Sequence, residues 1–141
     1  MALPKPAPGL VIHYNYLWHR EAEAGREDAR YARPCAIVVV ATKITPDGIA
    51  VMVSPITHSP PTEDDTAIEL PAAVKRALGL DDQRSWLVTN EVNAFAWPGH
   101  DLDYNRQGNI AYGVIPPALF TRIKNRLFEQ ARAGRLSRIV R

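Results

Sequence analysis

Four polar residues lie where a predicted β-hairpin begins and ends, and their side chains suit chemistry on a phosphate group. Arg33 begins the first apolar segment, and Thr57, His58 and Ser59 follow the second. The strands of a hairpin are antiparallel, so the start of the first strand lies beside the end of the second. The sequence therefore predicts a cation close to two hydroxyls and an imidazole.

Each of these side chains has a chemical role and a more ordinary alternative. Arg33 offers a charged, planar fork of donors that matches phosphate oxygens, and Pro34 after it restricts its backbone to extended conformations. The hydroxyls of Thr57 and Ser59 can donate to phosphate, and His58 can transfer protons near neutral pH. The alternatives are a surface arginine paired with a nearby acid, turn-capping hydroxyls and an exposed imidazole.

The other chemistry-bearing residues exclude several classes of site. The histidines at 13, 19 and 100 are further acid or base candidates, but no spacing resembles a metal triad, so neither a metal nor a cofactor is expected. Cys35 is the only cysteine, which excludes an internal disulfide, and its place in an apolar run predicts core packing. Trp18 and the aromatic residues near it can stack on bases or fill the core.

The elements that must position these residues follow from apolar pattern and turn chemistry. Residues 37–40 and 49–53 are β-branched runs joined by a Pro-Asp-Gly turn, which predicts a hairpin with both faces largely buried. Further strands are predicted within 10–18, 67–70, 85–89, 90–97 and 112–115. Helices are predicted over 72–78 and from Pro117 to about Gly134. Residues 19–31 are predicted to form an exposed mobile loop, with a short helix as the alternative. The predicted fold class is α+β: a small, curled antiparallel barrel with a C-terminal amphipathic helix.

Composition bounds the remaining possibilities. The chain has 141 residues, 46% of them apolar, which predicts an extended segment over 1–8 and one globular domain over 9–141. Neither a membrane-spanning run nor a signal-peptide segment is present, so no membrane contact and a cytoplasmic location are expected. The net charge is +2, yet the segment from Arg122 onward contains seven basic residues and only one acidic residue, Glu129. This bias suits an anionic partner or a solvated helix face, and the sequence leaves both open.

The order of these motifs resembles the MazF/PemK family of toxin endoribonucleases. The resemblance rests on Gly9-Leu10-Val11-Ile12, a charged loop containing Gly25, Arg33-Pro34 before a β-branched strand, and Pro55-Ile56-Thr57 at the end of the next strand. The resemblance extends to Gly113-Val114-Ile115-Pro116, the segment before the last helix. The chain departs from the family pattern over 70–80, where a helix is predicted, and at 89–93, where the family usually has an Asp-Gln pair.

The resemblance implies an SH3-like barrel, a homodimer, and a growth inhibitor that a cognate antitoxin neutralises. It also implies metal-independent cleavage of single-stranded mRNA by attack of a 2′-hydroxyl on phosphorus. The family's catalytic arginine and threonine fall on Arg33 and Thr57, with His58 as a candidate for proton transfer. Residues 19–31 match the loop that covers RNA, so RNA contacts are expected from Trp18, His19, Arg26, Arg30 and Ser59. The alternative from another class is a non-catalytic binder, because a related barrel poisons DNA gyrase by binding it.

Overall fold

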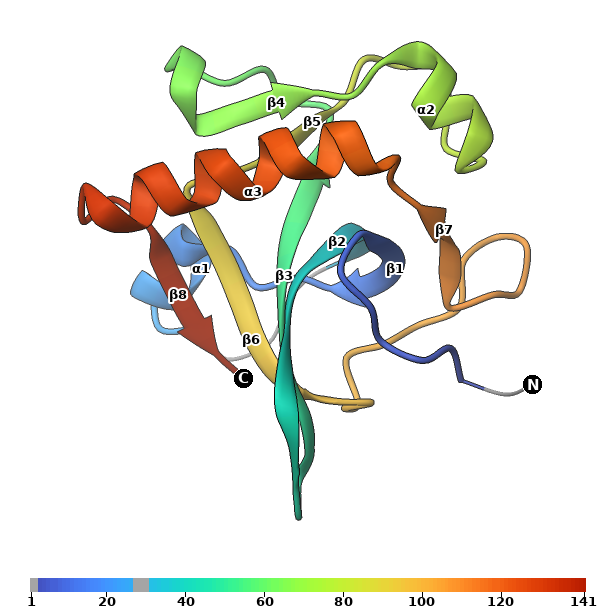
Figure 1. Ribbon diagram of the computed structural model, residues 1–141, viewed down its shortest axis with the longest axis vertical. Coiled ribbons are helices and arrows are strands. Elements are labelled where there is room, and N and C mark those ends of the chain that lie inside the picture. The colour runs from blue at the N-terminus through green and yellow to red at the C-terminus, as the bar shows by residue number, and fades with distance from the viewer. Residues whose placement is uncertain (1–2, 27–30) are drawn as a thin grey trace.

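The computed structural model describes residues 3–26 and 31–141 (Figure 1). Strands alternate with short helices along most of the chain, and the long helix α3 comes near its end. In chain order the elements are β1 (Leu10–Asn15), α1 (His19–Glu23), β2 (Ala32–Thr45), β3 (Gly48–Thr57), a 3₁₀ turn (Asp64–Thr66), β4 (Ala67–Glu69), α2 (Ala72–Ala77), β5 (Trp86–Val88), β6 (Glu91–Trp97), β7 (Ala111–Val114), α3 (Pro117–Arg132) and β8 (Ser137–Val140).

Strand β3 joins two antiparallel groups of strands. Its first half pairs with β6, and its last two residues pair with β5, which in turn pairs with β4. On its other side β3 pairs with β2, and the sheet continues through β1 to β7. The fold is therefore mainly β with few helices, which confirms the α+β class.

The predicted hairpin forms, and its inner half is buried on both faces. Cys35 lies opposite Pro55 and Thr45 opposite Gly48, so the strands run antiparallel as expected. Neighbouring positions such as Ala36 and Ile37 enter two different core clusters on opposite faces of the sheet. Sequence alternation along a strand sends successive side chains to opposite faces, so both faces of this strand must be covered.

The outer half of the hairpin contradicts the prediction of buried faces. Val39 is 48% exposed and Ile44 is 80% exposed. Figure 1 shows the tip of β2 and β3 extending beyond the rest of the molecule. The strands are longer than the sheet they join, so no neighbouring element covers their outer ends.

The hairpin turn depends on a glycine at position 48. Gly48 has φ 121°, and a Cβ there would collide with the carbonyl oxygen of Trp97. We expect Gly48→Ala to lower the free energy of unfolding by about 2 kcal/mol, because both the backbone conformation and the space are incompatible with a side chain. Chemical denaturation checks this against Gly134→Ala, which has a positive φ but open space around its Cα. Equal losses for the two variants would show that the Trp97 contact contributes nothing.

Helix α3 covers one of the two core clusters. It begins at Pro117, as predicted, and buries Leu119, Ile123 and Leu127 at helical spacing. Figure 1 shows it lying across the molecule between the β4–β5 pair and the larger sheet. Gly134, with φ 70°, follows the end of the helix. The prediction for α2 is also confirmed to within one residue, and α1 shows that the short-helix alternative was right for residues 19–23.

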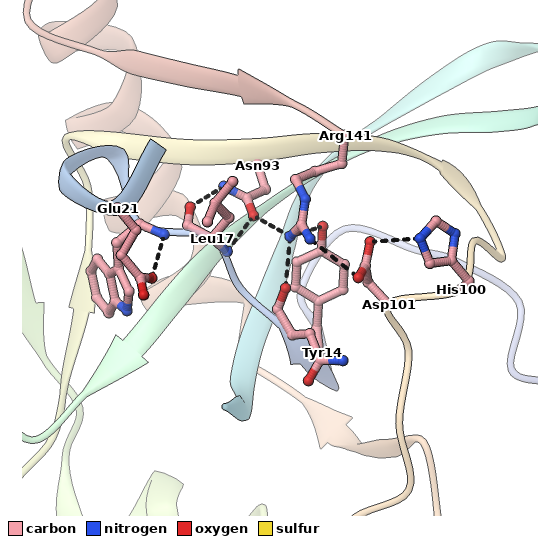
Figure 2. Close-up of polar contacts among 9 residues, drawn as sticks. Tyr14, Leu17, Glu21, Asn93, His100, Asp101 and Arg141 are labelled. Atoms are coloured by element: carbon pink, nitrogen blue, oxygen red, sulfur yellow. Dashed lines mark hydrogen bonds and ion pairs between the residues drawn. The ribbon is translucent and has the colours of Figure 1, made fainter. Parts of the chain in front are cut away.

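Strand β8 and the residue after it correct the prediction of a basic tail. Residues 137–140 pair with β6 in parallel. The Arg141 side chain is buried rather than solvated: its Nη1 donates to the carbonyl oxygen of Asn15 at 2.7 Å and to Asn93 Oδ1 at 3.2 Å, and its Nη2 lies 3.2 Å from Asp101 Oδ1 (Figure 2). Tertiary pairing therefore uses a charge for which the sequence left open an anionic partner or a solvated helix face.

Asn93 links this buried network to the segment that carries Trp18. Its side-chain oxygen accepts the Leu17 N–H at 2.8 Å, and its amide donates to the Leu17 carbonyl at 2.8 Å (Figure 2). A fully buried amide that satisfies both backbone groups of one residue holds the chain there in a fixed orientation. The start of α1 is fixed in the same way, because Glu21 Oε1 accepts the Trp18 N–H at 3.2 Å. Within the described ranges, no helix is long and apolar enough to cross a membrane.

Candidate functional site

A groove with a volume of about 840 Å³ opens where β1, β2 and β3 meet the loops after α2 and before β7. His13 lies within β1, Arg33 is near the start of β2 and Thr57 ends β3, and His58 follows directly after β3. Polar side chains from the two loops complete the walls. The remaining lining residues are Tyr31, Ala32, Pro34, Ile56, Gly79, Leu80, Asp81, Gln83, Ser85, Tyr104, Asn105, Arg106, Gln107 and Tyr112.

The groove brings Arg33 and Thr57 together from the two strands of the hairpin. The recorded pairing of the two strands extends to Cys35 opposite Pro55, and Arg33 and Thr57 each lie two positions beyond that pair. Thr57 Oγ1 accepts the backbone N–H of Ser59 at 3.1 Å, which is the turn-capping role expected as an alternative. That bond uses an oxygen lone pair and leaves the hydroxyl proton available to a ligand oxygen.

The Arg33 guanidinium is positioned by an aromatic ring. It lies 5.0 Å from the ring centroid of Trp18, and its Nε is buried without a hydrogen-bond partner among the described residues. A cation stacked on an indole keeps its charge while losing conformational freedom. Asn93 and Glu21 fix the backbone that carries Trp18, so this stacking rests on a rigid support.

His58 belongs to a chain of charged groups that includes residues from the α2 region. Its Nε2 lies 2.7 Å from Asp81 Oδ2, and the other carboxylate oxygen, Oδ1, lies 2.6 Å from Lys75 Nζ. Lys75 is buried, and its Nζ also donates to the carbonyl oxygen of Gln83. The Gln83 N–H donates to Asp81 Oδ1 at 3.1 Å, so the carboxylate is held by donors from three residues.

These contacts keep Asp81 ionised. Partial burial raises the pKa of its carboxyl. The hydrogen bond from Lys75, the charges of His58 and Lys75, and the Gln83 N–H lower the pKa, and together they outweigh burial. The net pKa therefore lies below the ordinary value for an aspartate. An ionised carboxylate fixed beside an imidazole orients the ring and determines which nitrogen carries the proton.

His13 faces the same groove from strand β1. Its Nδ1 lies 2.8 Å from the hydroxyl oxygen of Tyr112 on β7, and the two rings make an edge contact. Burial lowers the pKa of His13, and the nearby charge of Asp103 opposes this effect only in part. The imidazole is therefore mainly neutral at neutral pH. Burial raises the pKa of Tyr112 to about 12, so its hydroxyl keeps its proton.

A second, smaller hollow of about 420 Å³ adjoins the groove. Arg33 and Tyr31 line both, and Trp18 and Arg26, which were expected to contact RNA, line the second one. Trp18 is only 8% exposed and packs edge-on against Tyr16, so it serves the core as well as the hollow.

The other predicted RNA-contacting residues lie elsewhere. His19 is at the start of α1, with its Nε2 3.0 Å from Glu23, and it lines neither cavity. Ser59 is exposed just beyond the groove and also lines neither. Arg30 falls outside the described residues. Helix α3 contributes no residue to either cavity, so its basic side chains face a different part of the molecule.

Sequence reasoning missed several residues of this site, among them Lys75, Asp81, Arg106 and Tyr112. Asp81 is 23 positions from its partner His58, and no periodic pattern connects them. Lys75 is buried in a helix of six residues, and a buried ammonium needs a carboxylate partner, so its burial would have pointed to Asp81. Burial itself, however, is known only from the structure.

Two predictions about chemistry can be compared with this geometry. Cys35 is fully buried, and burial raises the pKa of its thiol, which confirms the prediction of core packing. Over the part of the chain that the structure describes, no group of three or more His, Cys, Asp and Glu side chains is arranged to hold a metal ion.

Comparison of the chain with protein-family models gives no match, and comparison with curated proteins gives none. The argument for function therefore depends on the groove. It combines a stacked guanidinium, a hydroxyl, two imidazoles and a second cation, Arg106, in a space large enough for a nucleotide phosphate and its neighbouring sugars. Donors of this kind stabilise negative charge on phosphate oxygens, and imidazoles exchange protons with the attacking and leaving oxygens.

Proposed function

We propose that this chain is a MazF/PemK-like toxin endoribonuclease that cleaves single-stranded mRNA without a metal ion. The observation that carries the proposal is the convergence of Arg33, Thr57 and His58 in one groove. Arg33 and Thr57 are the positions to which the family resemblance assigns catalysis. Both side chains line that groove, from the two paired strands of the hairpin, which supports the proposal.

The reaction requires only positioning, proton transfer and charge stabilisation. The 2′-oxygen of a ribose attacks the adjacent phosphorus, the P–O5′ bond breaks, and the products carry a 2′,3′-cyclic phosphate and a 5′-hydroxyl. Arg33 and Thr57 donate to the non-bridging oxygens, where negative charge increases in the transition state. The stacking of Arg33 on Trp18 holds the guanidinium in place before the substrate arrives.

The same proposal assigns the remaining properties of the family. The curved antiparallel strands of residues 9–141, with β3 shared between two groups, are proposed to form an SH3-like barrel. The uncovered outer half of the hairpin, including Val39 and Ile44, supports a homodimer because a second copy would cover these apolar side chains. The protein is proposed to act in the cytoplasm, where mRNA is found, and a cognate antitoxin is proposed to inhibit it.

Cleavage in the absence of divalent metal is the direct test. We expect purified, folded protein to cut a mixed-sequence single-stranded RNA in EDTA and to leave a 2′,3′-cyclic phosphate on the 5′ fragment and a 5′-hydroxyl on the 3′ fragment. A polynucleotide kinase should label that new 5′-hydroxyl directly, without prior treatment with a phosphatase. The matched control is the same RNA with 2′-deoxy sugars, which lacks the nucleophile and should stay intact. Intact RNA with measurable binding would instead favour the non-catalytic binder.

A further inference from the structure

The proposed function leaves open which groups give and take protons, and two histidines, His13 and His58, line the groove. Their environments differ in two ways. His58 is held by an ionised carboxylate at 2.7 Å, whereas His13 is partly buried against the Tyr112 hydroxyl at 2.8 Å. An acid–base reaction requires one group that gives a proton and one that takes it, and different environments separate the two roles.

We propose that His13 is the general base and His58 the general acid of the RNA cleavage proposed above, and that Asp81 is the positioning residue of His58. This assignment rests on the proposed function and deepens it. His13 takes the proton of the 2′-hydroxyl as the 2′-O–P bond forms. His58 gives its proton to the 5′-oxygen as the P–O5′ bond breaks, so no co-reactant is needed.

The hydrogen bonds around His58 support the role of acid. Nε2 donates to Asp81, so Nδ1 is the nitrogen left to exchange a proton with the substrate. The carboxylate compensates the charge of the imidazolium when both nitrogens carry protons. The side chain is 51% exposed and lines the groove, so a leaving oxygen can reach it.

The contact with Tyr112 supports the role of base for His13. With the proton on Nδ1, that N–H donates to the tyrosine oxygen and Nε2 carries the free lone pair. Burial favours the neutral imidazole, which is the form that a base requires. Asp103 lies close enough to oppose burial, but the net direction favours the neutral ring.

Both imidazoles line the groove, and they come from different strands. His13 lies on β1, opposite Pro34 of β2, and His58 follows the last residue of β3. A phosphate bound in the groove therefore meets two acid–base groups that different parts of the fold hold in place.

Lys75 explains why the carboxylate is kept in one orientation. Lys75 Nζ and the Gln83 N–H both donate to Oδ1 of Asp81, so Oδ2 is directed to His58. In Asp81→Asn the same donors would retain the amide oxygen, and the amide nitrogen would face His58 Nε2. Two donors cannot bond to each other, so Nε2 must become an acceptor and the proton must move to Nδ1.

The decisive experiment compares two RNA substrates. Wild-type protein is first used to map a cut site in a mixed-sequence RNA. A second RNA then carries sulfur in place of the 5′-bridging oxygen at that site. Sulfur leaves without protonation, so loss of the general acid should be harmless on this RNA. Single-turnover rates are measured on both substrates at saturating protein.

We expect His58→Gln to slow cleavage of ordinary RNA at least a hundredfold and to cut the sulfur RNA within threefold of wild type. His13→Gln should slow cleavage of both substrates at least a hundredfold, because the 2′-hydroxyl still needs a base. His100→Gln, an exposed histidine outside both cavities, should match wild type on both. Equal losses on the two substrates for His58→Gln, or rescue of His13→Gln by sulfur, would overturn the assignment.

The role of Asp81 has a separate readout in the folded protein without RNA. We expect nitrogen NMR of the imidazole to show neutral His58 with its proton on Nε2 in wild type and on Nδ1 in Asp81→Asn. Asp81→Asn should slow cleavage of ordinary RNA about tenfold or more, whereas its rate on the sulfur RNA should stay close to that of wild type. Asp81→Glu should cut ordinary RNA faster than Asp81→Asn. An unchanged tautomer would overturn the positioning role.

Wild-type protein that leaves both RNAs intact would overturn the proposed function itself, and the acid–base assignment with it.

Discussion

Arg33→Ala is expected to reduce the single-turnover rate of RNA cleavage about a hundredfold or more, which corresponds to about 2.7 kcal/mol of activation free energy. The guanidinium stacks on Trp18 and lines the groove. Its donors meet phosphate oxygens whose negative charge is larger in the transition state than in the bound substrate. Affinity for uncleaved RNA should therefore fall much less than the rate.

Two companion variants separate charge from geometry at this position. Arg33→Lys keeps a positive charge but loses the planar fork and its stacking, so its rate should lie between those of wild type and Arg33→Ala. Thr57→Ala removes the hydroxyl that lines the same groove as Arg33 and should also slow cleavage about a hundredfold, with little loss of binding. The effects of the two alanine variants should not add fully, because both side chains act on one phosphate.

The measurement pairs a rate with an affinity. Cleavage is followed at saturating protein, and affinity is measured with an RNA that carries a 2′-deoxy sugar at the cut site. Arg132→Ala is the matched control, because this exposed arginine ends α3 and lines neither cavity. Should Arg33→Ala cut at the wild-type rate once saturated, Arg33 has no catalytic role and the proposed function loses its main support.

Arg141→Ala is expected to produce the largest loss of stability, about 3 kcal/mol in the free energy of unfolding. The guanidinium is 6% exposed, and the Asp101 carboxylate that it binds is 13% exposed (Figure 2). Removing one partner of a buried ion pair leaves the other charge desolvated without compensation. The Asn15 carbonyl and the Asn93 oxygen would lose a donor as well.

Chemical denaturation gives the stability change, with Arg138→Ala as the matched control. Arg138 lies in the same strand, β8, but is exposed, so its loss should change stability by less than about 0.5 kcal/mol. The double variant Arg141→Ala with Asp101→Asn should recover part of the lost stability, because it removes the uncompensated charge. Equal stability of the Arg141 and Arg138 variants would show that the buried network does not hold β8 in place.

Local patterns determined the parts of this fold that depend on neighbours in the chain. The β-branched runs around a Pro-Asp-Gly turn predicted the hairpin, and antiparallel geometry predicted that Arg33 lies near Thr57 and His58, which line the same groove. Pro117 and the apolar stripe of α3 predicted that helix and its buried face. Cys35 inside an apolar run predicted a core thiol.

The tertiary structure alone decided which charges meet. Lys75, Asp81 and His58 form one chain of contacts, yet they come from a helix, a loop and a strand end that no shared periodicity connects. Arg141 pairs with Asp101 across 40 positions, although its charge seemed part of a basic tail. Apolar periodicity records which face of an element is buried, because burial repeats with the helix or strand period. An ion pair has no period, since it needs only two side chains that the fold brings together, and so the orienting partner of His58 became visible only once α2 was packed against the end of β3.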